Sequence, residues 1–115
     1  SKQMSDNISF EDFTKVDIRI GTIIKVEDFP KAKKPAYQLH IDFGSLGVKK
    51  SSAQITEMYS KEDLLNRQIT AIVNFKTKQI ANFQSECLVL GVTNSEDHIV
   101  LLQGSSKIKN GTQIN

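Results

Sequence analysis

Apolar and polar residues alternate through much of the first half of the chain. Over residues 16–26 the even positions are mostly apolar and the odd positions include charged side chains, which is typical of a half-buried strand. Gly21 falls on the polar face of this strand, where a missing side chain indicates a bend or bulge. The same alternation over residues 37–43 predicts a second strand, which closes at a turn at residues 44–47, and residues 48–54 are expected to continue as a third strand. The first half therefore predicts three strands of a curved sheet.

Two short helices are predicted by a serine followed three residues later by an aspartate. Ser9 with Asp12 predicts a helix at residues 10–14, and Ser60 with Asp63 predicts one after the third strand. A fourth strand is expected at residues 69–75, and a closing hairpin at residues 88–93 and 98–102. Residues 74–86 are expected to form a long loop before that hairpin.

The order of these elements predicts an all-β fold, namely a five-stranded OB-fold barrel with short helices at the N-terminus and between strands 3 and 4. An SH3-like barrel or another small β-barrel is the alternative, because strand count and alternation do not fix connectivity. Residues 1–8 lack periodicity and predict a flexible N-terminal arm, which leaves residues 9–115 as the domain.

Composition narrows the class of protein. A chain of 115 residues suits one domain, and its apolar runs are too short for a membrane span or a signal peptide. The single cysteine, Cys87, lies in an apolar run and is expected to be a buried thiol. We therefore expect a cytoplasmic protein without membrane insertion. The two histidines and Cys87 show no metal-ligand spacing, and no common enzyme motif is present, so no metal, cofactor or catalytic residue is predicted.

Charge is unevenly distributed, although the formal net charge is only +2. Residues 30–50 contain five lysines and one aspartate, and residues 74–86 mix lysines, amides and apolar groups. Lysines can neutralise phosphates, and the rings of Phe75 and Phe83 could stack on unpaired bases. The alternative is that both rings cap the core while Lys76 and Lys78 keep the loop soluble. The first interpretation predicts a surface that binds nucleic acid, and the second predicts a solvated surface without a binding role.

Two stretches of the sequence carry a family resemblance. Residues 13–23, followed by residues 73–80 with Ser85 and Glu86, resemble the signatures of the tRNA-binding domain family, which includes the C-terminal domain of methionyl-tRNA synthetase. Within that family, residues 34–37, 41–44, 46–49 and 51–56 are similar to the CsaA-type secretion chaperones. The resemblance implies a cytoplasmic OB-fold homodimer without enzymatic activity or cofactor, with tRNA and unfolded precursor proteins as partners.

Three hypotheses about function follow. The first is a CsaA-like chaperone that binds unfolded export precursors through four apolar residues: Phe29, Phe75, Ile80 and Phe83. The second is a tRNA-binding auxiliary protein related to the synthetase domain, which would contact tRNA through seven residues: Arg19, Lys33, Lys34, Lys49, Asn74, Lys76 and Lys78. The third is a dimerising subunit that tethers a synthetase or the export machinery.

Overall fold

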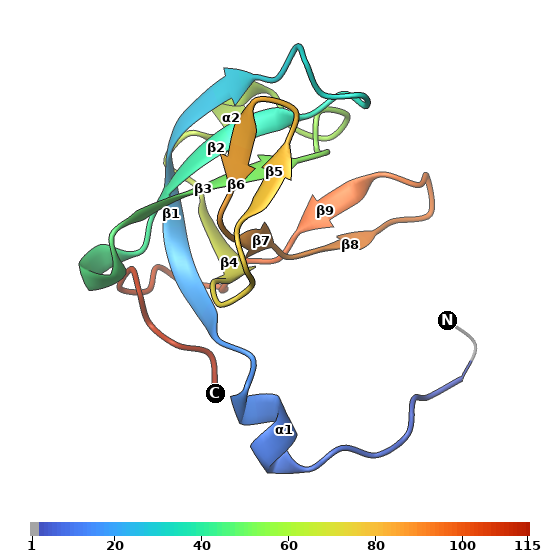
Figure 1. Ribbon diagram of the computed structural model, residues 1–115, viewed down its shortest axis with the longest axis vertical. Helices are drawn as coiled ribbons and strands as arrows, with labels where there is room; N and C mark the ends of the chain where they lie inside the picture. The colour runs from blue at the N-terminus through green and yellow to red at the C-terminus, as the bar shows by residue number, and fades with distance from the viewer. Residues whose placement is uncertain (1–2) are drawn as a thin grey trace.

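A curved, five-stranded antiparallel sheet forms the body of the protein in the computed structural model, which describes residues 3–115 (Figure 1). The strands are ordered β3-β2-β1-β4-β7 across the sheet. Their bounds are Ile18–Asp28 for β1, Tyr37–Asp42 for β2, Val48–Ala53 for β3, Gln68–Ile72 for β4 and Leu88–Val89 for β7.

Hydrogen bonds between the two edges of the sheet nearly close it into a barrel. The Glu86 amide donates to the Lys50 carbonyl at 2.7 Å, and the Lys50 amide donates to Glu86 Oε1 at 2.9 Å. One residue along each segment, Ser51 Oγ donates to the Cys87 carbonyl at 3.0 Å. The interior is filled by fully buried side chains: Ile23, Leu39, Ile41, Phe43, Leu64 and Ile69. This arrangement confirms the predicted all-β OB-like barrel.

The first strand departs from the predicted alternation. Its pairing with β2 shifts between Ile23 and Lys25, so a bulge places Ile23 in the core and leaves Ile24 44% exposed. The prediction that Ile24 shares the buried face is therefore wrong, because the inserted residue changes which positions face the core, from Ile23 before it to Val26 after it. Gly21 does not lie on the polar face either. A Cβ there would lie 2.6 Å from Ile41 Cγ2, so its missing side chain makes room for the core.

Both predicted helix starts are confirmed. In α1 (Phe10–Thr14) the Asp12 amide donates to Ser9 Oγ at 3.0 Å, and in α2 (Lys61–Leu64) the Asp63 amide donates to Ser60 Oγ at 3.1 Å. A 3-10 helix, η1 (Gly44–Leu46), forms the turn before β3. Of the predicted arm, residues 1–2 lie outside the described residues, and residues 3–9 contain no helix or strand. Its flexibility stays a prediction.

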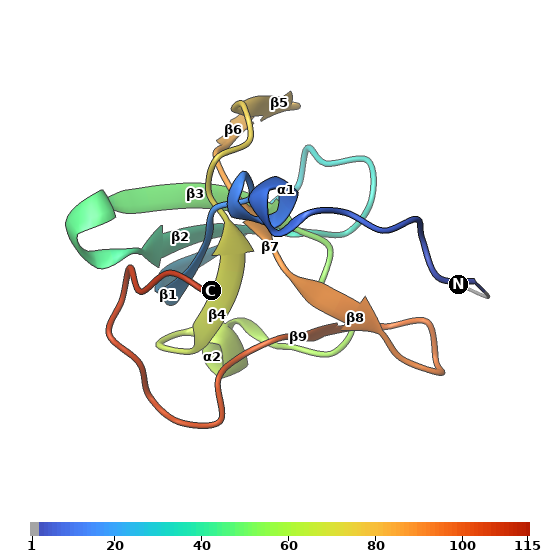
Figure 2. The ribbon, with the colours of Figure 1, turned by 90° about the horizontal axis from the view of Figure 1, so that it is seen from below.

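Two hairpins extend from the barrel. The predicted loop at residues 74–86 contains one of them, β5 (Lys78–Ile80) with β6 (Phe83–Ser85), so its assignment as a plain loop is wrong. Its two strands have three residues each, too few to show a period in the sequence. The predicted closing hairpin is confirmed as β8 (Gly91–Thr93) with β9 (Ile99–Leu101). Its predicted first strand, residues 88–93, is divided, because Leu88–Val89 pairs with β4 as β7. Figure 2 shows the β5–β6 hairpin on one side of the barrel and α2, with the segment after β9, on the other.

The C-terminal segment returns to the first strand. The Gly111 amide donates to the Ile20 carbonyl at 2.7 Å, and the Ile114 amide donates to the Ile18 carbonyl at 2.8 Å. This segment therefore occupies the edge of β1 beyond its pairing with β2. Among residues 3–115, no helix has the length and apolar character needed to cross a membrane.

Candidate functional site

The β5–β6 hairpin rests on a small hydrophobic cluster that is separate from the barrel core. We define the satellite cluster as Phe29, Ala36 and Phe83, with Ala32 and Ile80 packed against them. The rings of Phe29 and Phe83 lie 5.4 Å apart between their centroids. Since Phe29 and Ala36 flank the loop after β1, the cluster brings that loop and the hairpin side by side.

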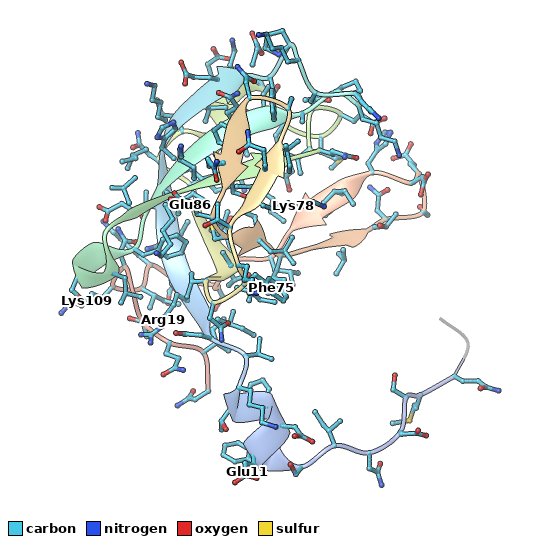
Figure 3. All side chains as sticks on the ribbon, in the orientation of Figure 1. Glu11, Arg19, Phe75, Lys78, Glu86 and Lys109 are labelled. Carbon is cyan, nitrogen blue, oxygen red and sulfur yellow. The ribbon has the colours of Figure 1, made fainter. Side chains whose placement is uncertain are left out.

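The two segments that meet at the satellite cluster, the loop after β1 and the β5–β6 hairpin, both carry lysines. Lys33 and Lys34 lie in the loop after β1, and Lys76 and Lys78 lie at the start of the hairpin; all four are exposed. None of them forms an ion pair with another residue in the described part of the chain. Figure 3 shows Phe75 and Lys78 on the stretch that enters the hairpin. We call these four residues the lysine surface; they are free to neutralise the charges of an anionic partner.

A further cation below the hairpin was missed by the sequence analysis. Lys50 Nζ lies 5.3 Å from the centroid of the Phe83 ring, a cation–π distance. Neighbouring side chains on a strand point to opposite faces, so Lys49 and Lys50 cannot both face the hairpin. Both lysines are half-buried, and the ring contact shows that Lys50, not the predicted Lys49, faces the hairpin. The alternation along β3 shows that only one of the two lysines can face the hairpin, and the fold is needed to show that it is Lys50.

Arg19 and Asn74 make contacts that hold the chain together. Arg19 donates to Asp17 through Nε at 2.6 Å and to the Gly111 carbonyl through one terminal nitrogen at 3.0 Å. Asn74 accepts from the Asp17 amide at 3.0 Å and donates to the Lys15 carbonyl at 2.8 Å. These bonds fix the ends of β1 and β4. Both side chains were predicted to contact nucleic acid, and in the structure both form hydrogen bonds within the fold.

The four predicted peptide-contact residues differ in accessibility. Phe29 and Phe83 are buried in the satellite cluster, Ile80 is partly buried against it, and Phe75 is 58% exposed. The rings of Phe29 and Phe83 therefore hold the hairpin on the barrel. Of the four predicted residues, only Phe75 presents a large apolar surface to solvent.

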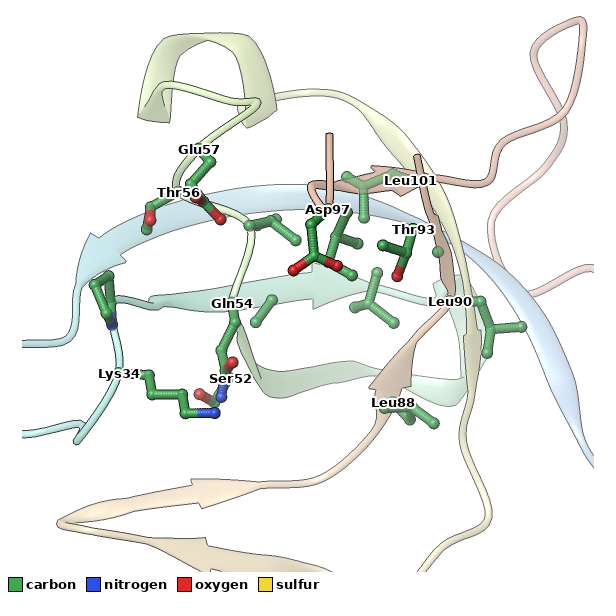
Figure 4. Close-up of a pocket in the computed structure, with 16 residues that line it drawn as sticks. Lys34, Ser52, Gln54, Thr56, Glu57, Leu88, Leu90, Thr93, Asp97 and Leu101 are labelled. Atoms are coloured by element: carbon green, nitrogen blue, oxygen red, sulfur yellow. The ribbon is translucent and has the colours of Figure 1, made fainter. Parts of the chain in front are cut away.

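An open groove of about 740 Å³ lies between the end of β3 and the β8–β9 hairpin (Figure 4). Its apolar lining comes from the end of β3, from β7 and from β9: Ala53, Ile55, Leu88, Val89, Ile99 and Leu101. Among the predicted site residues, only Lys34 lines this groove. The groove was missed because it combines segments that are distant in the sequence, and a half-exposed apolar residue such as Leu88 was the one available signal.

Charged and polar side chains surround the apolar lining of the groove. Lys34 and Gln54 lie toward one end, and Glu57 and Asp97 lie toward the other. Glu57 Oε2 is also 3.4 Å from His98 Nε2. An apolar floor with polar groups at its rim suits a ligand that has apolar side chains and a hydrogen-bonding backbone.

Residues 3–115 contain no group of His, Cys, Asp and Glu that could hold a metal ion. Burial raises the pKa of the Cys87 thiol to about 12, so this thiol stays protonated and is a poor nucleophile near neutral pH. The lysine surface and the groove are the two described surfaces that suit contact with a partner.

Comparison with known proteins identifies relatives along almost the whole chain. A family model described as a putative tRNA-binding domain matches residues 18–113. The chaperone CsaA of Bacillus anthracis is 50% identical, with a TM-score of 0.90 over 96% of this chain and 100% of that one. The CsaA chaperone protein of Picrophilus torridus is also 50% identical, with a TM-score of 0.89 over 95% of this chain and 100% of that one.

Similarity also extends to part of a much longer enzyme. The methionine–tRNA ligase of Thermococcus onnurineus is 36% identical over 107 residues, which are 93% of this chain and 14% of the ligase. The chain therefore spans only a small fraction of the ligase's length.

Proposed function

The chain belongs to the tRNA-binding domain family, and from that premise we propose that it is a CsaA-like chaperone that holds incompletely folded polypeptides in the groove beside the β8–β9 hairpin. The observation that carries the proposal is the groove itself, which is open and apolar along its floor. Two 50% identical structures named as CsaA chaperones support it. The clients are unfolded export precursors, which the protein binds in the cytoplasm without catalysing a reaction.

A substitution in the groove tests this proposal. Leu88 lines the groove and is 48% exposed, so a bound chain can cover about half of its side chain. Covering that area is worth about 1 kcal/mol, so Leu88→Ala should weaken binding of a permanently unfolded, fluorescently labelled protein about fivefold. Fluorescence anisotropy measures this affinity, and thermal melts of each variant establish that it is folded.

Val92 provides a matched control. It is 51% exposed on β8 and does not line the groove, so Val92→Ala should leave the affinity unchanged. If both variants bind the unfolded protein as the parent does, or lose affinity equally, the groove is not the binding site.

A second candidate function is tRNA binding, favoured by the lysine surface and by the family to which the chain belongs. Exposed lysines without acidic partners suit phosphate contacts, which position a nucleic acid without reading its sequence. The Leu88→Ala substitution should leave tRNA binding intact, because Leu88 adds no charge. The two functions can therefore be separated by different variants.

We also propose a homodimer, the arrangement that a tethering subunit would require. The N-terminal segment supports this because Met4, Ile8 and Phe10 are 95%, 70% and 75% exposed, and contact with a second copy would cover them. Sedimentation should then give about twice the chain mass of 12.9 kDa. A monomer at micromolar concentration would contradict this proposal and leave the groove proposal standing.

A further inference from the structure

A second, polar pocket of about 340 Å³ lies where the chain leaves α2 and where it leaves β9. Its lining includes the cations Arg67 and Lys107, and Ser105 and Ser106 add two hydroxyl groups. No carboxylate is among the residues that line it. The lining therefore offers positive charge and hydrogen-bond donors, which are the groups that bind oxyanions in proteins.

Arg67 is held in place before any ligand arrives. Its guanidinium carbon lies 5.0 Å from the centroid of the Tyr59 ring, and its Nε donates to the Asp63 carbonyl at 3.2 Å. One terminal nitrogen donates to Gln103 Oε1 at 3.0 Å, and the other has no acceptor among residues 3–115. The Asp63 carboxylate accepts from the Ser60 amide at 3.0 Å, which lowers its pKa, and the positive charge of Arg67 lowers this pKa further. An ordered guanidinium with donors to spare loses little entropy when it binds an anion.

The loop that carries the other donors is also fixed. Gln68 donates to the Ile108 carbonyl through Nε2 and accepts from the Ile108 amide at 3.0 Å, so it anchors the end of the loop. At the start of the loop, the Leu102 amide donates to the Leu90 carbonyl at 3.2 Å. Lys107 is exposed and forms no ion pair with another described residue. The ammonium and the two hydroxyls are therefore presented from an anchored loop.

We propose that this pocket binds a phosphate group through the guanidinium of Arg67, the ammonium of Lys107 and the hydroxyls of Ser105 and Ser106. The pocket adjoins α2 and the segment after β9, on the opposite side of the barrel from the β5–β6 hairpin (Figure 2). It is thus separate from both the lysine surface and the groove, and it does not depend on either proposed function. The phosphate group can belong to a polynucleotide backbone or be free phosphate.

Chemical-shift titration of the full chain by NMR tests the proposal. Inorganic phosphate is added at constant ionic strength, with chloride as the reference anion. We expect saturable shifts of the amides of residues 66–68 and 103–107, with a millimolar Kd and no comparable shifts at residues 78–85. K107Q should weaken this Kd about twofold to fivefold, as expected for the loss of one exposed charge contact. K109Q is the matched control, because Lys109 is an exposed lysine of the same segment outside the pocket.

A short single-stranded RNA, added at the same concentration of phosphate groups, distinguishes the two sources. If the pocket is a polynucleotide subsite, the RNA shifts the same amides at lower concentration than inorganic phosphate does. If the pocket takes free phosphate, inorganic phosphate alone shifts them. The proposal is overturned if neither compound shifts these amides beyond chloride, or if K107Q and K109Q have equal effects.

Discussion

Replacing the four residues of the lysine surface, Lys33, Lys34, Lys76 and Lys78, with alanine should weaken tRNA binding and flatten its dependence on salt. All four side chains are exposed and lack an acidic partner among the described residues, so each is available to a phosphate. Each lost contact lowers the slope of log affinity against log salt by about 0.7 to 0.9, which gives about 2.8 to 3.6 for four contacts. When salt rises about fourfold, the parent should lose about 50 to 150 times more affinity than the variant.

Filter binding or fluorescence anisotropy with bulk tRNA, at several salt concentrations, measures this slope. A matched control removes four other lysines: Lys15, Lys25, Lys61 and Lys109. Three of them form ion pairs, at 3.1 Å with Asp12, 3.7 Å with Glu27 and 3.0 Å with Asp28. The control therefore changes the net charge equally while leaving the lysine surface intact.

Two results would refute the reasoning about the lysine surface. One is a folded four-lysine variant that binds tRNA with the parent's affinity and salt slope. The other is a control variant whose slope falls as far as that of the lysine-surface variant, because net charge rather than local contact would then explain binding. Thermal melts of both variants confirm that each is folded before its affinity is compared.

Four further predictions concern the stability and reactivity of the barrel. Arg19→Gln removes a charged donor from the Gly111 carbonyl and should lower the free energy of unfolding in urea by about 2 kcal/mol; an unchanged urea midpoint would contradict this. Gly21→Ala would place a Cβ 2.6 Å from Ile41 Cγ2 and should cost about 1 to 3 kcal/mol, measured as a fall in Tm of about 4 °C per kcal/mol. The Cys87 thiol should react with a disulfide reagent at about pH 8 only after denaturation, because burial raises its pKa; rapid reaction of the native protein would be the contrary result. Since the pKa of the thiol is 9.0 when it is unfolded and about 12 when it is folded, the stability from Cys87 should fall as pH rises between these values, and Cys87→Ala should lack this fall.

Local signals in the sequence predicted the elements that depend on local physics. Ser9 and Ser60 each accept from the amide of an aspartate three residues later, so the helix starts could be identified from residue type and spacing. The alternation over residues 37–43 matches β2, whose side chains alternate between buried and half-buried positions. The bulge at Ile24 was hidden because the apolar residues on either side of it kept an even spacing that the structure does not follow.

Features that depend on distant contacts could not be predicted in the same way. Residue type alone gives Arg19 and Asn74 the properties of nucleic-acid contacts, and only their partners across the fold show that they connect the ends of strands. The groove combines the end of β3 with β7 and β9, and both of these strands lie more than thirty residues after β3 in the chain. The pairing of Lys50 with Phe83 likewise requires knowledge of which face of β3 the hairpin covers.

Because the satellite cluster is separate from the barrel core, the β5–β6 hairpin can unfold independently of the barrel. The cluster has only three buried members, whereas the barrel core has eleven, so the β5–β6 hairpin can open at a lower free energy than the barrel. Opening would break the bonds of its base to β3, such as that from the Ser52 amide to Ser85 Oγ at 3.2 Å, and would leave the five-stranded sheet paired. The spacing of Lys76 and Lys78 relative to Lys33 and Lys34 can thus adapt to the shape of a bound partner while the barrel remains folded.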